Sequence, residues 1–297
     1  MKTNENRINN LPNDLITLIL NKLNYKPIET LSPLRQVNKK FKECVDSYVE
    51  VLPRKYYRLV TDDILNQFTN LKLLFLLENC KVTDIGVRKL TNLITLDLDA
   101  NPIITDKALS YLTNLTTLNL RSNSTITDES LNHLTNLTSL SLFCNKYVTD
   151  KALSLLTNLT TLILDNTKHI TDKGLSLLTN LTSINLGYNY HITDKALNLL
   201  TNLKTLSLEH NLNITDECLY LLTNLTSINL TDNSNITDKG VSLLTNLKTL
   251  SLERNLNITD EGISLLTNLF YNTTDSWETY NTPIQYIDFI GSVENNL

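Results

Sequence analysis

The stretch that decides the fold is LTTLNLRSNSTITDESLNHLTN, residues 115–136, because two different hydrophobic periodicities follow one another within it. In the first part, Leu118 and Leu120 alternate with polar residues, which is the period of a half-buried strand. The second part opens with Thr127-Asp128 and continues with leucines three residues apart, which is helical spacing. Threonine is a favourable N-cap, and an aspartate in the first turn interacts favourably with the helix dipole. We therefore predict one short strand followed by one short helix.

The same pattern recurs with a period of 22 residues and no insertion, so that ten units cover residues 49–268. One unit is too short to bury both its strand leucines and its helix leucines. Stacked units bury them against each other, which is the principle of a solenoid. The repeat thus predicts an α/β fold in which a parallel sheet lines one face and short helices line the other.

Two further positions of the repeat are nearly constant and suggest specific packing roles. An asparagine follows each strand, where its amide can satisfy backbone groups left unpaired by the turn. Small residues hold one helical position, which implies close backbone approach to a neighbouring unit. The asparagines are at 79, 101, 123, 145, 189, 211, 233 and 255, with Thr167 in the remaining unit, and the small residues are at 86, 108, 130, 152, 174, 196, 218, 240 and 262.

The pattern LxxLxLxxN followed by ITDxxLxxL resembles the leucine-rich-repeat family across residues 49–268. This resemblance implies a curved, right-handed solenoid with its parallel sheet on the concave face and its short helices on the convex face, used for protein binding. Unit 49–70 departs from the pattern and is predicted to be a degenerate capping repeat, followed by regular repeats over 71–268. The aromatic-rich tail, 269–297, is predicted to cover the last repeat, with a bound peptide-like segment as the alternative.

The segment before the repeats has a different organisation. Residues 1–10 are predicted to be flexible, and residues 11–48 suggest three short helices. The latter resemble an F-box, from LPNDLITLILNKL to LRQVNKKFKECVDS. That resemblance implies docking onto a Skp1-like adaptor, and through it onto a cullin-RING ubiquitin ligase, by the matching residues Leu11, Pro12, Leu15, Ile19, Leu23, Leu34, Val37 and Phe41. The alternative is a helical cap that shields the first repeat.

Variable positions after the strand leucines suggest where a target protein binds, because the fold does not dictate them. Large and aromatic side chains gather in the middle units, and these are the residue types that anchor protein interfaces. The predicted target-binding residues are Arg121, Phe143, Tyr147, Asp165, His169, Tyr188, Tyr190, His191 and His210. Acidic residues flank this cluster, namely Asp97, Asp99, Glu209 and Glu253, so a basic or mixed-charge partner is expected. The alternative is scattered variation on a solvent-facing surface.

Composition and motifs exclude several classes of function. Residues 1–60 contain 11 basic and 6 acidic side chains, whereas the remainder contains 15 and 25, so a nucleic-acid-binding surface is not expected on the acidic repeats. No apolar run of membrane-spanning length and no secretory leader is evident, which predicts a cytoplasmic protein, with a nuclear location as an option. Neither a catalytic motif nor a metal-ligand spacing is present, so no enzyme activity, cofactor or metal is expected.

These features together predict a substrate-recognition subunit of a Skp1–cullin–F-box ubiquitin ligase. In this reading, the F-box docks on the adaptor and the solenoid binds an unknown target protein. A first alternative is a protein-interaction scaffold without a link to the ligase. A second is an internalin-like adhesin, because the Leu-Thr-Asn-Leu units of 22 residues also resemble that family, although its ITDIxPL element is replaced here by Ile-Thr-Asp-Lys-Ala/Gly-Leu.

Overall fold

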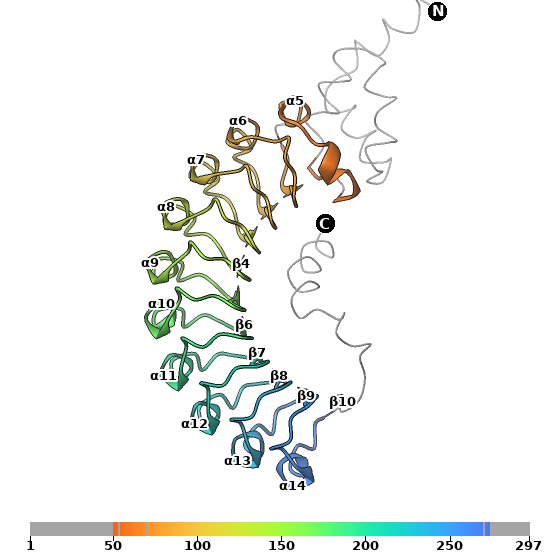
Figure 1. Cartoon of the computed structure of the whole chain (residues 1–297), viewed down its shortest axis with the longest axis vertical. Coiled ribbons are helices and arrows are strands. Elements are labelled where there is room, and N and C mark those ends of the chain that lie inside the picture. Colours follow the sequence, from red (N-terminus) through yellow and green to blue (C-terminus); the bar gives the residue numbers. More distant parts are fainter. Residues whose placement is uncertain (1–49, 53, 69, 270, 274–297) are drawn as a thin grey trace, which may run out of the picture.

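The computed structural model of the chain describes residues 50–52, 54–68, 70–269 and 271–273. In this part of the chain, the units stack into a curved array with strands along the inner side and helices along the outer side (Figure 1). The predicted leucine-rich-repeat solenoid is thus confirmed. The segment that resembles an F-box, residues 11–48, lies outside the described residues.

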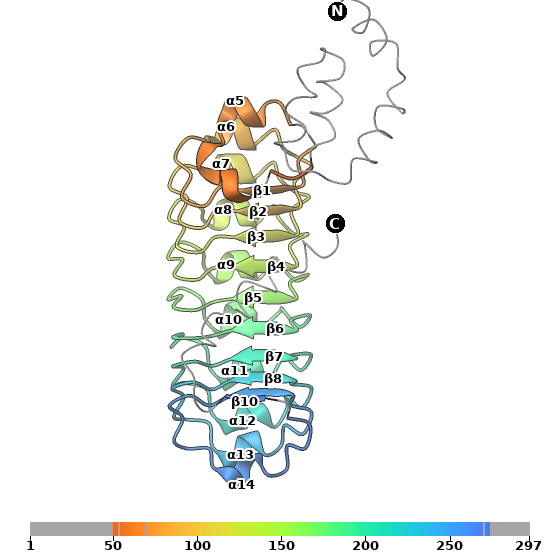
Figure 2. The ribbon, with the colours of Figure 1, turned by 90° about the vertical axis from the view of Figure 1, so that its right-hand side faces the viewer.

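Strands of the described units form one parallel sheet whose order follows the chain from β1 to β10 (Figure 2). Each strand pairs with the next in a register of one full unit, so that Leu73 lies beside Thr95 and Thr95 beside Thr117. The strands are β1 (Leu73–Phe75), β2 (Thr95–Asp97), β3 (Thr117–Asn119), β4 (Ser139–Ser141), β5 (Thr161–Ile163), β6 (Ser183–Asn185), β7 (Thr205–Ser207), β8 (Ser227–Asn229), β9 (Thr249–Ser251) and β10 (Tyr271–Thr273).

One short helix follows in each unit, and each begins at the aspartate of the Thr-Asp pair. The preceding threonine is the N-cap, as predicted: the side chain of Thr171, for example, accepts a hydrogen bond of 3.3 Å from the backbone N–H of Lys173. The helices are α5 (Asp62–Leu65), α6 (Asp84–Val87), α7 (Asp106–Leu109), α8 (Asp128–Leu131), α9 (Asp150–Leu153), α10 (Asp172–Leu175), α11 (Asp194–Leu197), α12 (Asp216–Leu219), α13 (Asp238–Val241) and α14 (Asp260–Ile263), preceded by the 3₁₀ helix η1 (Arg54–Leu59).

Both ends of the sheet continue past the regular repeats. Residues 271–273, which belong to the tail predicted from the sequence, form β10 and pair with β9. At the other end, Val51 makes a parallel bridge to Leu73, and Leu52 and Phe68 of unit 49–70 are buried in the common core. Strand pairing uses backbone groups, so it continues where the leucine pattern has been lost.

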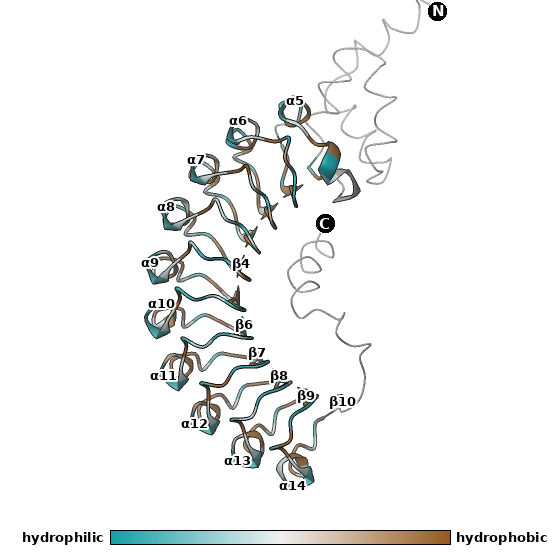
Figure 3. Ribbon diagram, viewed as in Figure 1, coloured by the Kyte–Doolittle hydropathy of each residue, from teal (hydrophilic) through white to brown (hydrophobic). Residues whose placement is uncertain are grey.

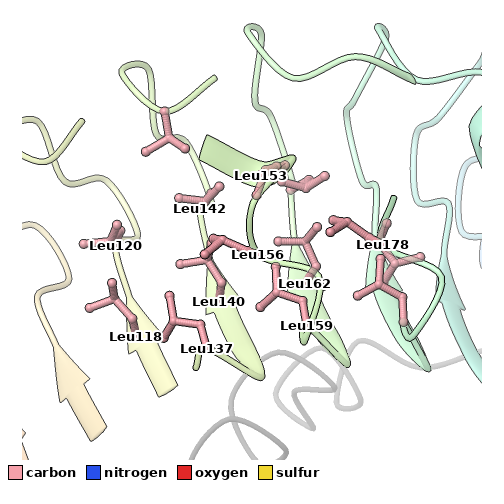
Figure 4. Close-up of a cluster of buried hydrophobic side chains, with 14 of the residues drawn as sticks. Leu118, Leu120, Leu137, Leu140, Leu142, Leu153, Leu156, Leu159, Leu162 and Leu178 are labelled. Atoms are coloured by element: carbon pink, nitrogen blue, oxygen red, sulfur yellow. The ribbon is translucent and has the colours of Figure 1, made fainter. Parts of the chain in front are cut away.

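The core is one continuous cluster of buried hydrophobic residues, most of them leucines, that runs through all the units. Hydrophobic residues, drawn brown, recur from unit to unit along the ribbon (Figure 3). Leu118, Leu140 and Leu162 come from three adjacent strands, all have an exposed fraction of 0%, and lie side by side (Figure 4). Burying one such side chain stabilises the fold by about 1.5–3 kcal/mol. Because each unit contributes the same set, every unit stabilises both of its neighbours.

The predicted asparagine ladder is present between the core and the outer loops. In one unit, the buried Asn189 donates its side-chain amide to the Leu164 and Thr167 carbonyl oxygens of the preceding unit, at 3.4 and 3.3 Å. Its Oδ1 atom accepts hydrogen bonds from the backbone N–H groups of His191 and Ile192. One side chain therefore closes the turn in its own unit and joins it to the unit before.

A second ladder, formed by the aspartate that begins each helix, joins the helical side of the units. The carboxylate of Asp150 accepts hydrogen bonds from the backbone N–H and the hydroxyl of Thr171 in the next unit, at 2.8 and 2.7 Å. This carboxylate also limits the size of the residue in the small-residue row: a Cβ atom on Gly174 would lie only 2.5 Å from Asp150 Oδ1, and the units without glycine have nothing larger than alanine, serine or cysteine there. The aspartate thus links neighbouring units in addition to its predicted interaction with the helix dipole.

Candidate protein-binding surface

The inner face of the sheet carries the side chains that alternate with the buried leucines. The last residue of several strands makes a hydrogen bond to the backbone that follows the strand. The side-chain oxygens of Asp97, Asn119 and Asn185 accept hydrogen bonds from the N–H groups two residues further on. Asp97 was predicted to flank the target-binding cluster as a solvent-facing acidic residue, but only 2% of it is exposed. That expectation was wrong because neighbouring strands are close enough for their side chains to cover one another.

Arg121 and Phe143 form the first contact between predicted target-binding residues. They extend from adjacent units just after β3 and β4, and the guanidinium carbon lies 4.2 Å from the centroid of the phenyl ring. Both side chains are half-buried. A cation over an aromatic face is held by about 0.5–1 kcal/mol where the pair remains in contact with solvent, so the pair presents a fixed apolar and charged surface.

Asp165 is buried in the next unit, although it was predicted to be a surface residue of the cluster. Its exposed fraction is 4%, and burial raises the pKa of its carboxyl from 3.8 to about 7, with a further increase from the nearby Glu209 charge that outweighs the opposing effect of Arg121. Gly187 leaves room for this carboxyl, because a Cβ atom there would lie 2.7 Å from Asp165 Oδ1. Asp165 therefore forms part of the floor between Phe143 and Glu209.

Tyr188 and His210 begin a row of contacts along the rim of the sheet. Their rings stack with centroids 4.5 Å apart, and His210 Nε2 lies 3.0 Å from an Asp232 carboxylate oxygen. The same oxygen is 2.8 Å from an Arg254 guanidinium nitrogen. Four consecutive units are thus connected by a ring stack, a histidine–carboxylate contact and an arginine–carboxylate ion pair, and the predicted residues Tyr188 and His210 lie together.

The remaining predicted residues, Tyr147, His169, Tyr190 and His191, lie apart from these contacts. They follow the asparagine ladder, in the loops that lead to the next helices, and all four are exposed. The cluster predicted from sequence is therefore divided between the concave face, its rim and the loops beyond the rim.

Sequence reasoning missed the backbone conformation of the rim. In the described repeats, one residue per unit, two positions after the last strand leucine, has φ between 48° and 55°, and none of these residues is a glycine. They are Glu78, Ala100, Ser122, Cys144, Asn166, Tyr188, His210, Asp232 and Arg254. A position with so varied a set of side chains gives no sequence signal of the left-handed region, which favours glycine or asparagine.

The predicted adaptor-binding residues Leu11, Pro12, Leu15, Ile19, Leu23, Leu34, Val37 and Phe41 all lie outside the described residues. Among the residues that the structure does describe, no helix has the length and apolar character needed to span a membrane.

Comparison with known proteins agrees with both parts of the chain. Residues 8–50 match the F-box domain, and residues 111–131, 133–156, 155–178, 221–244 and 243–266 match the leucine-rich repeat. The chain has no match among curated proteins.

Solved structures similar to the chain include two internalins of Listeria monocytogenes. Internalin InlF is 27% identical, with a TM-score of 0.51 over 72% of this chain and 70% of that chain. Internalin InlC2 is 29% identical, with a TM-score of 0.47 over 73% of this chain and 84% of that chain.

The fold and its repeated core define a leucine-rich-repeat protein. Since an F-box domain precedes the repeats, the chain belongs to the F-box/leucine-rich-repeat proteins.

Proposed function

We propose that the protein is a non-catalytic substrate receptor of a Skp1–cullin–F-box ubiquitin ligase. The observation that carries this proposal is the order of the two matched families: an F-box at residues 8–50 directly precedes an array of leucine-rich repeats, whose parallel sheet forms one long face. The F-box would bind a Skp1-like adaptor, and the solenoid would bind the target. Such a receptor acts inside the cell, where the ligase components are.

The contribution of such a receptor to ubiquitin transfer is proximity. A target held on a rigid solenoid experiences a raised effective concentration of the charged conjugating enzyme, so its lysines react faster without any catalytic group on the receptor. We assign target binding to the concave face and its rim. The Arg121–Phe143 pair and the Tyr188–His210 stack offer aromatic and arginine side chains of the kind that dominate interface energies.

Adaptor binding is tested by co-purification of the full chain with a Skp1-like protein. Leu11→Glu and Ile19→Glu should each abolish capture, because a buried charge in an apolar interface is costly. Leu177→Glu is the matched control, since Leu177 is 56% exposed on the helical side of the repeats, and it should leave capture unchanged. Wild-type chain that captures no adaptor, or capture that survives both F-box substitutions, would refute the ligase role.

Target binding is tested separately by the triple substitution of Phe143, Tyr188 and His210 by alanine. The variant should keep the adaptor and lose the targets that the wild-type chain captures. Retention of the same targets would rule out this part of the concave face.

A second candidate function is that of an adhesin-like protein binder, and the similarity to internalin InlF favours it. Both candidates use the solenoid to bind a protein and differ in whether an adaptor is bound. The co-purification experiment therefore distinguishes them.

A further inference from the structure

The exposed residues beyond the rim form a surface with a chemistry of its own. We name Lys146, Tyr147, Lys168, His169, Tyr190 and His191 the loop-edge patch. All six side chains are exposed, with Tyr147 and Tyr190 each at 49%. They occupy the same two repeat positions in three successive units.

The three units of the patch are held in register by the sheet. Strands β4, β5 and β6 pair without a bulge, so the loops that follow them are neighbours. Strand spacing of about 4.8 Å places the outer two units of the patch about 10 Å apart at the sheet, which matches about three residues of an extended peptide. Asn145 and Asn189 fix the loops from inside by accepting the N–H groups of Tyr147 and His191.

Later units show that the fold does not require these side chains. At the position of Tyr147, His169 and His191, the next three units have Asn213, Asn235 and Asn257, and each of these amides donates to a backbone carbonyl of the preceding unit. In the three units of the patch, an exposed tyrosine or histidine ring holds this position instead, whereas the three units before them have Lys81, Ile103 and Thr125. The patch thus gives up a structural hydrogen bond for a group suited to contact a partner.

Charge distinguishes the patch from the rest of the repeats. From each rim residue to each helix N-cap, residues 144–149, 166–171 and 188–193 include no aspartate or glutamate, as is also true of four of the other six regular units. Among the regular units only the patch has lysine at the first of its two repeat positions, Lys146 and Lys168, whereas the chain beyond residue 60 has 25 acidic against 15 basic side chains. The carboxylates that begin the adjacent helices are engaged: those of Asp150 and Asp172 accept hydrogen bonds from Thr171 and Thr193. The lysine, tyrosine and histidine side chains of the patch can all donate hydrogen bonds, which suits a partner that has acceptors such as carboxylates.

We propose that the loop-edge patch binds an extended acidic peptide segment of a partner protein. Lys146 and Lys168 attract the carboxylates of this segment, and Tyr147 and Tyr190 contact its backbone and apolar side chains. An acidic segment is repelled by the acidic concave face and is therefore directed to the patch. This chemistry differs from the basic or mixed-charge partner that the sequence predicted for the whole cluster.

A nucleic acid is the less suitable polyanion. Binding of a phosphate backbone depends on many cationic contacts along its length, and here two lysines lie within an acidic solenoid. The small patch fits one short acidic segment. The proposal concerns the repeats alone and does not depend on the adaptor.

The test uses the full chain and a fluorescein-labelled ten-residue peptide of alternating glutamate and leucine, followed by fluorescence anisotropy at low and high salt. Wild-type protein should bind this peptide, more weakly at high salt, and should not bind the corresponding lysine–leucine peptide through the patch. Lys146→Glu with Lys168→Glu should weaken binding at least about tenfold. Lys204→Glu with Lys248→Glu changes the net charge equally at exposed positions next to the strand starts, and should change binding less than about twofold.

A second pair of double variants tests the contribution of the patch tyrosines to peptide binding. Tyr147→Ala with Tyr190→Ala should weaken binding about three- to tenfold, whereas Tyr111→Ala with Tyr220→Ala, at tyrosines that are 58% and 53% exposed, should leave it unchanged. Equal losses in both lysine pairs would overturn the proposal, because they would indicate a net-charge effect. No loss in the patch tyrosine pair, or equally tight binding of a labelled ten-nucleotide thymidine strand through Lys146 and Lys168, would also overturn it. Adaptor capture is unaffected by any of these results, so the two proposals fail independently.

Discussion

Replacing Asp165 by asparagine is expected to change how the stability of the protein depends on pH. In the folded chain, burial raises the pKa of the Asp165 carboxyl to about 7, against 3.8 in its ordinary state. Between these values the folded state keeps a proton that the unfolded state has released. The contribution of the Asp165 proton to the free energy of unfolding is therefore fully present below about pH 4 and is lost as the pH rises through about 7.

The magnitude follows from the size of the pKa difference. One pKa unit corresponds to 1.36 kcal/mol, so a rise from 3.8 to about 7 corresponds to about 4 kcal/mol between pH 4 and pH 8. Asparagine has nearly the same shape as aspartate and does not ionise. The variant should therefore match the wild-type chain at pH 4 and exceed its free energy of unfolding by up to about 4 kcal/mol at pH 8.

Urea denaturation at half-unit steps from pH 4 to pH 8.5, monitored by circular dichroism, measures this difference directly. Glu129→Gln is a suitable control, because Glu129 is exposed on the helical side, and the stability difference of this variant should change little with pH. Glu209→Gln removes one cause of the raised pKa of Asp165. In this variant the fall in stability should therefore end at a lower pH than in the wild-type chain, and the total loss should be smaller. The reasoning is refuted if Asp165→Asn differs from wild type by the same amount at pH 4 and pH 8.

Two further substitutions test the turns. Ala100 has φ of 48°, so Ala100→Gly should raise the free energy of unfolding by about 0.5–1 kcal/mol. Ala152 has the helical conformation of α9, so Ala152→Gly should lower the free energy of unfolding by about 1 kcal/mol. Thermal or urea unfolding of both variants measures these opposite signs, and equal signs would contradict the conformational explanation. Asn189→Ala should lower the free energy of unfolding by about 3 kcal/mol or more, because it leaves buried carbonyl and N–H groups of two units without their partner. Thr167→Asn should be neutral or stabilising. A loss below about 1 kcal/mol for Asn189→Ala in urea unfolding would show that water replaces the amide.

Much of the candidate binding surface could be located from sequence, because repetition reveals the positions that the fold leaves variable. Phe143 and Tyr188 stand out in rows in which most of the other residues are small or polar. Their grouping could not be derived in the same way. Arg121 contacts Phe143 and Tyr188 stacks on His210, whereas Tyr190 lies in a loop beyond the rim, because the chain turns sharply between positions 188 and 190.

The environment of Asp165 shows why surface positions are harder to predict than core positions. The sequence places this aspartate on the concave face, and the face is indeed where it lies. Its environment depends on Gly187, which leaves room for the carboxyl, and on the charges of Arg121 and Glu209, all of which come from other units. No local pattern includes such contacts, so neither the burial nor the raised pKa is visible in the sequence.

By itself, the sequence determined the period, the alternation of strand and helix, the caps and the leucine core of this protein. It did so because each depends on contacts that are local or repeated identically from unit to unit. Tertiary structure decided the left-handed rim, the aspartate links between helices and the separation of the acidic concave face from the loop-edge patch. These features arise where neighbouring units meet and where the chain reverses direction, and there the position of a side chain depends on residues one full unit away.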